Sequence, residues 1–403
     1  MKAGPLAGIR VLDLTNVIMG PLATQILAGL GAEVIKIEGP GGDDMRHVVP
    51  MRHPGMGHIY LHLNRGKKSL VLDLKNARAR EALLRLVPGA DVLVSNVRLP
   101  ALKRLGLDYE ILSAIHPALV YVNCCGFDPG GPYAGRPAYD DLIQGASGIA
   151  WLMQRYGGGE PGYAPVTLAD RVTGLHAAYA VCAALYARER TGRGQSVDVP
   201  MFEAMAQFVL GDHMGGLTFL PPEGDPGYAR LLTPNRAPYR TKDGYLCVLI
   251  YNDKHWRNFF DAIGEPERFE RDERFCNHTN RARHIDEVYS WVAGILRSRT
   301  TSEWVQILDM ADIPCSPMNS PADILADPHL TGTGFIAREA HPTEGNMYVM
   351  GTPTSWSGTP PGSPLPVPRF GEHSAALQRE DGYPEEEIRS LAEAGATVLL
   401  QEH

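Results

Sequence analysis

The sequence predicts an α/β protein organised around a parallel β-sheet. Short apolar segments typical of strands alternate with helix-like segments between residues 9 and 123. Such strand–helix–strand repetition is typical of a doubly wound sheet with helices on both faces. The length of 403 residues is enough for two or three domains. The composition, 44% apolar and 21% charged, excludes a disordered, collagen-like or coiled-coil chain.

The elements of the N-terminal half are predicted one after another. A strand at 9–14 is followed by a helix at 21–30, whose apolar residues recur at helical spacing until Gly31 ends it. Segments rich in glycine and proline predict loops. The other elements expected here are strands at 34–37, 68–74, 92–94, 119–123 and 196–199, helices at 77–86, 142–152 and 170–190, and loops at 126–137 and 157–162.

A change in composition marks the second half of the chain. Residues 219–243 contain five prolines and several glycines, which predicts a linker between domains. A strand at 244–250 and three helices follow, and Thr300 and Glu303 have the spacing of a capping box at the start of the third helix. Two earlier helices are expected around 256–263 and 285–296, and a last one at 384–394 after an extended segment at 332–368.

Charge and cysteine content limit the partners and the compartment. The 38 basic and 46 acidic residues give a net charge of −8, so no overall field attracts nucleic acid or an anionic membrane, and only a local basic site is left for a small polyanion. The longest apolar candidate, 172–187, has 16 residues and includes His176, whereas a membrane span needs roughly 20. No signal peptide is recognised. Six cysteines without metal-ligand spacing predict reduced thiols and a cytoplasmic location.

Several common catalytic and nucleotide-binding motifs are absent from the sequence. It contains no GxxxxGK[ST], GxSxG or HExxH motif, and Gly29 and Gly31 stand at a helix end instead of in a GxGxxG turn. His58 and His62 have the spacing of two metal ligands on one helix face. No third ligand is near them in the sequence, so no metal site is predicted.

Asp170 stands at the expected start of the long helix, directly after a loop. One interpretation is that Asp170 caps this helix, which contributes about 0.5–2 kcal/mol. The alternative is catalytic, because the positive end of the helix dipole would keep the carboxylate ionised. An exposed, ionised carboxylate can attack an activated acyl group. The local sequence alone leaves both interpretations open.

A series of short sequence motifs along nearly the whole chain helps to decide between the two interpretations of Asp170. They lie at 6–14, 20–21, 30–38, 64–69, 90–96, 105–109, 138–140 with Gln144, 191–195, 312–317 and 371–374. This ordered set closely resembles the class III CoA-transferases, the family of formyl-CoA transferase and carnitine CoA-transferase. No single motif is decisive, but the order of all of them is specific.

The resemblance implies a fold that composition does not show. It implies a Rossmann-like large domain built from both chain ends, a small α/β domain between them, and an interlocked homodimer. The domains are then expected at 1–218 (large domain, N-terminal part), 219–243 (linker), 244–331 (small domain) and 332–403 (extended linker and C-terminal part of the large domain).

The resemblance also implies an activity and places the catalytic aspartate of the family on Asp170. This carboxylate would attack a donor acyl-CoA, for which succinyl-CoA is a candidate, and form a mixed anhydride. An aspartyl-CoA thioester would follow, from which CoA passes to an organic acid. CoA and acyl-CoA are then substrates, and no tightly bound cofactor and no metal are expected.

Contacts with CoA follow from the same resemblance. Lys75 and Arg104 make physical sense, because the phosphates of CoA need cationic donors in a protein of net negative charge. The alternative for both is ordinary solvated surface charge, and Leu72 and Leu105 would serve equally well in a core. The implied contacts are Val17, Leu72, Lys75, Asn96, Arg104 and Leu105, with Arg136 and Tyr139 near the pantetheine end.

Two alternative functions remain at this point. An α-methylacyl-CoA racemase would have the same fold and aspartate but a histidine where this chain has Tyr139, and a tyrosine with a pKa near 10 is a poor base. A CoA-binding protein without catalysis would keep Asp170 as a helix cap. The chain also departs from the formyl-CoA transferase pattern: residues 232–239 lack its tetraglycine run, and Ile18 and Met19 stand where it has a glutamine. A less polar pocket predicts a larger acceptor, such as a C4–C5 dicarboxylate or an aromatic or branched acid.

Overall fold

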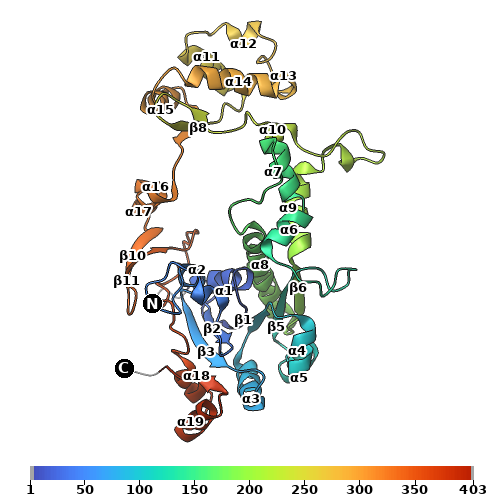
Figure 1. The fold of residues 1–403 in the computed structure, drawn as a ribbon, viewed down its shortest axis with the longest axis vertical. Helices are drawn as coiled ribbons and strands as arrows, with labels where there is room; N and C mark the ends of the chain where they lie inside the picture. The colour runs from blue at the N-terminus through green and yellow to red at the C-terminus, as the bar shows by residue number, and fades with distance from the viewer. Residues whose placement is uncertain (1–3, 401–403) are drawn as a thin grey trace. The chain divides into compact units, whose positions relative to one another are not determined.

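The computed structural model describes residues 4–400, which divide into two compact units (Figure 1). Unit 1 contains the described residues up to 148, residues 163–208 and those from 329 onwards, so both ends of the described chain belong to it. Unit 2 contains Ile149–Gly162 and Val209–Pro328. No helix among residues 4–400 is long and apolar enough to cross a membrane.

Unit 1 is built on a seven-stranded sheet with the order β12-β3-β2-β1-β4-β5-β6. The six strands from β3 to β6 are parallel, and only β12 runs antiparallel to its neighbour β3. The order 3-2-1-4-5-6 is that of the Rossmann fold, so the predicted parallel α/β architecture is confirmed. The strands are β1 (Arg10–Leu14), β2 (Glu33–Glu38), β3 (Lys67–Leu72), β4 (Val92–Ser95), β5 (Val120–Cys125), β6 (Ser196–Pro200) and β12 (Thr397–Val398).

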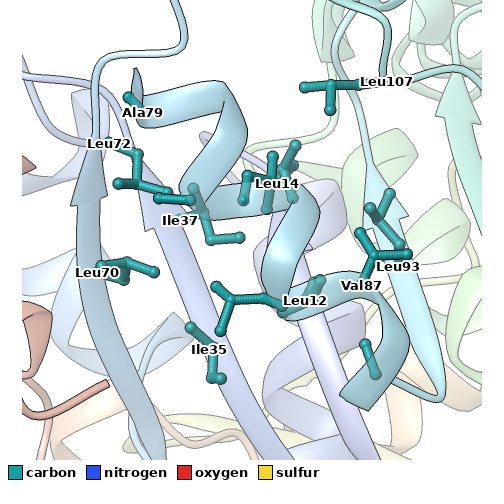
Figure 2. Close-up of a cluster of buried hydrophobic side chains, with 14 of the residues drawn as sticks. Leu12, Leu14, Ile35, Ile37, Leu70, Leu72, Ala79, Val87, Leu93 and Leu107 are labelled. Atoms are coloured by element: carbon teal, nitrogen blue, oxygen red, sulfur yellow. The ribbon is translucent and has the colours of Figure 1, made fainter. Parts of the chain in front are cut away.

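Helices cover both faces of this sheet, and its strands are buried on both sides. Alternate side chains of a strand point to opposite faces. On one face lies a cluster that includes Leu12 and Leu14 of β1 and Leu83 of α3. Figure 2 shows Leu12, Leu14, Ile35, Ile37, Leu70 and Leu72 gathered beside Ala79. The helices that contribute to this cluster are α3 (Ala77–Leu86), α4 (Leu99–Leu105), α5 (Tyr109–Ile115), α18 (Ser374–Glu380) and α19 (Glu385–Glu393).

The opposite face is covered by α1 (Met19–Gly29) and α8 (Leu168–Thr191), which pack against each other. Helix α1 contacts β1 and β2, and α8 contacts β5 and β6. The two helices approach closely at Gly174, where a Cβ atom would lie 2.7 Å from the carbonyl oxygen of Met19. This contact fixes the start of α8 against the start of α1.

Unit 2 has its own core. Its three-stranded antiparallel sheet consists of β7 (Tyr239–Arg240), β8 (Tyr245–Val248) and β9 (Cys315–Pro317). The buried cluster behind the sheet is rich in aromatic residues, including Trp256, Phe259 and Phe260. The predicted capping box of Thr300 and Glu303 is confirmed at α15. The helices are α7 (Ile149–Gly157), α10 (Ala229–Leu232), α11 (Asp253–Ala262), α12 (Arg268–Arg271), α13 (His278–Arg283), α14 (Ile285–Leu296), α15 (Thr301–Met310) and α16 (Pro321–Leu325).

The structure differs from the sequence prediction in several segments. The helix expected at 142–152 is two helices, α6 (Asp140–Ala146) and α7, because Gly148 between them has a φ of 95°. Helix α7 belongs to unit 2, where the Tyr156 hydroxyl donates to the carbonyl of Arg236 at 2.7 Å. Several elements were not predicted, among them α4, α5, α9 (Met201–His213), α18, β12 and a hairpin of β10 (Ile336–His341) and β11 (Gly345–Met350) within the segment predicted to be extended.

Buried charges join the central strands of the sheet to one another. Lys67 and Asp13 are fully buried, and the Lys67 ammonium lies 2.9 Å from an Asp13 carboxylate oxygen. The ammonium also donates to the carbonyl of Pro21 at 3.0 Å and to the side chain of Asn64 at 2.8 Å. Burial lowers the pKa of Lys67 to about 8, and the Asp13 charge opposes this shift. The ammonium therefore keeps its proton at neutral pH.

A second ion pair continues this network. The Lys36 ammonium lies 2.8 Å from Asp43 and donates to the carbonyl of Thr15 at 2.8 Å. A third pair joins Arg46 and Glu38 through two hydrogen bonds of 2.7 Å. We name these six side chains the buried ion network. Its members are Asp13, Lys36, Glu38, Asp43, Arg46 and Lys67, each at most 2% exposed.

Lys67 and Lys68 give a matched test of this network. They are neighbours on β3, but Lys68 is partly exposed and pairs with Glu33 at the surface. Lys67→Met leaves Asp13 buried without its cation, so we expect a loss of about 3–5 kcal/mol in the free energy of unfolding of unit 1. Lys68→Met is expected to cost about 0–1 kcal/mol. Urea unfolding of both variants measures the difference, and equal losses would contradict the structural role of Lys67.

Candidate active site

A cavity of about 590 Å³ opens at the carboxyl edge of the parallel sheet. Its walls come from the segments that follow β1, β4 and β5, together with residues 134–140 and Asp170 of α8. After β1 the chain forms α1 on one face of the sheet, and after β4 it forms α4 on the other face. Neighbouring strands whose connections part in this way form a topological switch point, where ligands of doubly wound proteins bind.

Two asparagines join the loops on either side of the switch point. The side chain of Asn96 accepts from the N–H of Asn16 at 3.0 Å and donates to its carbonyl at 2.8 Å. The next residue, Val17, has a φ of 72°, which is unfavourable for a β-branched side chain. Its N–H donates to the Asp43 carboxylate at 3.2 Å, so the buried ion network holds this strained residue in the cavity wall.

The start of α8 is fixed by a carboxylate and an amide from α6. One Asp140 oxygen accepts from the backbone N–H of Asp170 at 3.0 Å, and the other accepts from Gln144 at 2.6 Å. The buried Gln144 also accepts from the N–H of Ala164 at 2.9 Å and donates to the carbonyl of Val166 at 3.2 Å. Asp140 and Gln144 thus hold both Asp170 and the segment that leads into its helix.

Asp170 does not cap the helix. The N-cap is Thr167, and Asp170 is the third residue of α8, with 9% of its surface exposed. Burial, the largest cause, and the charge of Asp140 raise its pKa, Arg171 opposes the shift, and the result is a rise from the ordinary 3.8 to about 7. The sequence predicts that the helix N-terminus keeps this carboxylate ionised, but at a pKa of about 7 it is only partly ionised at neutral pH, because burial and the Asp140 charge both raise the pKa.

The nine residues that the sequence assigned to the site fall into two groups. Those that line the cavity are Val17, Asn96, Arg136, Tyr139 and Asp170. Those that do not are Leu72, Lys75, Arg104 and Leu105. Leu72 has its side chain in the core cluster beside α3, as Figure 2 shows. Leu105 packs against the same cluster, and Lys75 and Arg104 are exposed.

Sequence reasoning missed several residues of the cavity. Arg98 lines the cavity as an exposed cation at the start of α4. It follows the predicted contact Asn96 by two residues, and this closeness in sequence was the available signal. Asp140 lies inside a recognised motif, and its spacing of four from Gln144 on a helix was the available signal for their hydrogen bond. Cys124 and Cys125 also line the cavity, but burial raises the pKa of both thiols, that of Cys125 to about 12. Neither is a thiolate at neutral pH.

The cavity holds no histidine, and among residues 4–400 no three His, Cys, Asp or Glu side chains gather as metal ligands would. The Asp170 carboxylate has no hydrogen-bond donor within the described part of the chain. An unpaired carboxylate of raised pKa in a cavity at a switch point is a candidate functional group.

Residues 6–374 match the family model described as CoA-transferase family III. The chain belongs to this family. It is an enzyme of the class III CoA-transferases, as the resemblance of its motifs predicted, and CoA-transferases use CoA thioesters as substrates.

Characterised relatives cover nearly the whole chain. The succinate–glutarate CoA-transferase of Agrobacterium fabrum is 34% identical over 93% of this chain and 95% of its own length. The acetyl-CoA:oxalate CoA-transferase of Acetobacter aceti is 33% identical over 95% of this chain and 97% of its own. The formyl-CoA:oxalate CoA-transferase of Shigella sonnei is 32% identical over 96% of this chain and 98% of its own.

Solved structures of the family share the fold. A CAIB/BAIF family protein from Brucella suis has a TM-score of 0.79 and 33% sequence identity, with 94% of this chain and all of that chain covered. The protein Rv3272 from Mycobacterium tuberculosis gives a TM-score of 0.79 at 31% identity, with 93% of this chain and 99% of that chain covered.

The raised pKa of Asp170 predicts a pH-dependent cost to stability. A folded state that binds a proton more tightly than the unfolded state loses stability as pH rises from 3.8 to about 7. Roughly three pKa units correspond to at most about 4 kcal/mol. We therefore expect Asp170→Asn to raise the melting temperature at pH about 8 and to change it little at pH about 4.

The neighbouring surface aspartate provides the control for this measurement. Asp141 is exposed on α6 and does not line the cavity, so Asp141→Asn should show no such trend between the two pH values. If the effect of Asp170→Asn is the same at both pH values, the unfavourable ionisation of Asp170 is disproved.

Proposed function

We propose that this enzyme transfers CoA from a donor acyl-CoA to an organic acid and that Asp170 is its nucleophile. The observation that supports this most strongly is the position of the Asp170 carboxylate, which lies in the wall of the switch-point cavity without a hydrogen-bond donor of its own. A carboxylate already engaged by donors would be a weaker nucleophile.

Each proposed step exchanges one anion for another at an acyl carbon. The Asp170 carboxylate attacks the donor thioester carbon and CoA leaves as a thiolate, which gives a mixed anhydride. The thiolate attacks the Asp170 carbonyl carbon and releases the donor acid, which leaves an aspartyl-CoA thioester. The acceptor carboxylate displaces CoA from Asp170, and the thiolate then attacks the acceptor acyl carbon and frees Asp170. No step needs a proton, so the site requires no histidine base.

The cavity residues have distinct roles in this proposal. Val17, Asn96 and Tyr139 bind the pantetheine arm, and Arg98 and Arg136 face its polar groups. The proposed partners of the CoA phosphates are Lys75 and Arg104, exposed after β3 and on α4. We propose no metal and no tightly bound cofactor.

The acceptor is proposed to be larger than formate. Met19 lines the cavity, and Ile18 and Met19 are buried where the sequence pattern calls for a polar glutamine. Relatives are named for dicarboxylates, glutarate and oxalate among them. A C4–C5 dicarboxylate or an aromatic or branched acid fits a less polar wall, and succinyl-CoA is the proposed donor to try first.

We also propose that the chain works as a homodimer in the cytoplasm. Leu175, Tyr179 and Tyr186 repeat along one side of α8 at helical spacing, and each is between 56% and 66% exposed. The other side of α8 is buried in unit 1, so the uncharged part of the helix between Val172 and Ala187 is largely apolar on both sides, as in helices that are covered on both sides. A second copy of the chain is the proposed cover, and interlocked subunits would bury this stripe. All six cysteines are unpaired, which suits a reducing compartment.

Covalent trapping tests the proposed nucleophile. After mixing with succinyl-CoA or acetyl-CoA and quenching with hydroxylamine, we expect the peptide that contains Asp170 to change in mass. Asp170→Ala should abolish the adduct and Asp141→Ala should retain it, because Asp141 lies outside the cavity lining. An adduct on another residue would overturn the assignment. Exchange of the α-proton of a bound acyl-CoA for deuterium without an adduct would favour the racemase instead, and binding without either reaction would favour a CoA-binding protein.

The pH dependence of the reaction with the donor acyl-CoA tests the effect of the Asp140 charge on the pKa of Asp170. The reacting form of Asp170 is the carboxylate, so kcat/KM for the donor should fall below pH about 7 in the parent enzyme. Asp140→Asn removes a charge that raises this pKa and should move the acid limb to lower pH. Gln144→Leu loses the hydrogen bonds of the Gln144 side chain but keeps the Asp140 charge. It should therefore lower kcat/KM without shifting the acid limb to lower pH. An unmoved acid limb in Asp140→Asn would contradict the account.

A further inference from the structure

Unit 2 contains a second cavity that the proposed reaction does not use. It has a volume of about 530 Å³ and lies beside the end of β8 and the start of β9. All of its lining residues belong to unit 2, between Arg230 and Ser316. A volume of this size is within the range of small-molecule sites.

Most of the wall is apolar. Pro238, Val248, Leu249 and Ile250 line it, and Trp256 closes it toward the aromatic core. No acidic residue lines this cavity. A ligand enclosed here therefore meets a largely apolar surface without negative charge.

The polar groups of the cavity converge on one cation. The Arg230 Nε atom donates to the Tyr289 hydroxyl at 3.1 Å, and its guanidinium carbon lies 5.9 Å from the centre of the Tyr251 ring. The two terminal nitrogens of Arg230 have no hydrogen-bond or ion-pair partner within residues 4–400. Arg230 is thus held at one end by tyrosines and presents the free fork that binds a carboxylate in bidentate fashion.

A second arginine adds positive charge to the same wall. Arg236 lines the cavity with an exposed side chain that has no ion pair among the described residues. The acidic groups nearby are engaged elsewhere: Asp286 accepts from Thr233, and Asp309 is the partner of the Cys315 thiol. The cavity is therefore complementary to an anion.

We propose that this cavity of unit 2 is a binding site for a small carboxylic acid with an apolar body. The carboxylate would pair with the terminal nitrogens of Arg230, and the body would lie against the apolar wall that ends at Trp256. A ligand with a polar body would leave its polar groups unpaired on the apolar wall. The site goes beyond the proposed transfer reaction, since it is argued from unit 2 alone and does not depend on Asp170.

Titration calorimetry with 3-phenylpropionate and its neutral analogue 3-phenylpropionamide tests this site on the full-length protein. We expect saturable binding of the acid and binding of the amide weaker by roughly tenfold or more, because a charge-assisted pair is lost. Arg230→Met should weaken acid binding by a similar factor and leave amide binding unchanged. Arg230→Lys, which keeps the charge without the fork, should lie between the two.

Matched variants separate this site from the cavity of unit 1. Arg283→Met removes an exposed arginine of α13 that does not line the cavity, and it should bind the acid like the parent protein. If only Arg98→Met weakens binding, the acid sits in unit 1 and the proposal is wrong. Equal binding of acid and amide, or no saturable binding of the acid, would also overturn it. Asp170→Ala should bind 3-phenylpropionate normally, so a failed transferase assignment is distinguishable from a failed acid site.

Discussion

The active-site region of unit 1 depends on charges buried between the sheet and the segments that follow its strands. Three cations and three anions make the ion network neutral, and each carboxylate lies next to a lysine or arginine. Taking such charges out of water costs several kcal/mol per ion, so the network is a weak source of net stability. Its effect is to define one arrangement of the loops, because any other arrangement would leave a charge buried and unpaired.

That arrangement extends directly into the cavity. Asp43 is a member of the network and also accepts from the N–H of Val17, whose left-handed backbone lines the cavity wall. Lys36 holds the carbonyl of Thr15 in the same loop. Across the cavity, Asp140 holds the backbone of Asp170 while its charge raises the pKa of that carboxyl. The fold thus fixes the proposed nucleophile in place and makes its ionised form less favourable than that of an exposed aspartate.

The sequence predicted the architecture well because its strands are apolar segments bounded by clear turns. Predicting the parallel sheet and the capping box at Thr300 requires only local patterns. The hairpin of β10 and β11 lies in a Pro- and Gly-rich stretch without regular periodicity. Its pairing comes from backbone hydrogen bonds that composition does not encode.

The site was predictable only in part for similar reasons. The motifs located Asp170 and four other cavity residues, and the apolar strand around Leu72 fits a core position as well as a CoA contact. Burial is a property of the whole fold, so the raised pKa of Asp170 had no local signal. Arg230 had no local signal either, because its Nε atom is held by the hydroxyl of Tyr289, a residue 59 positions away in the sequence.

Oxygen-18 transfer tests the central claim most directly. Succinyl-CoA and succinate labelled with oxygen-18 in both carboxylates would be incubated with the enzyme, and the peptide that contains Asp170 would be analysed by mass spectrometry. The proposed steps leave one oxygen of the acceptor on Asp170 after a single turnover, so the account predicts heavy oxygen in that side chain. Exchange of CoA between the two succinates with unlabelled Asp170 would contradict a nucleophilic role for this residue.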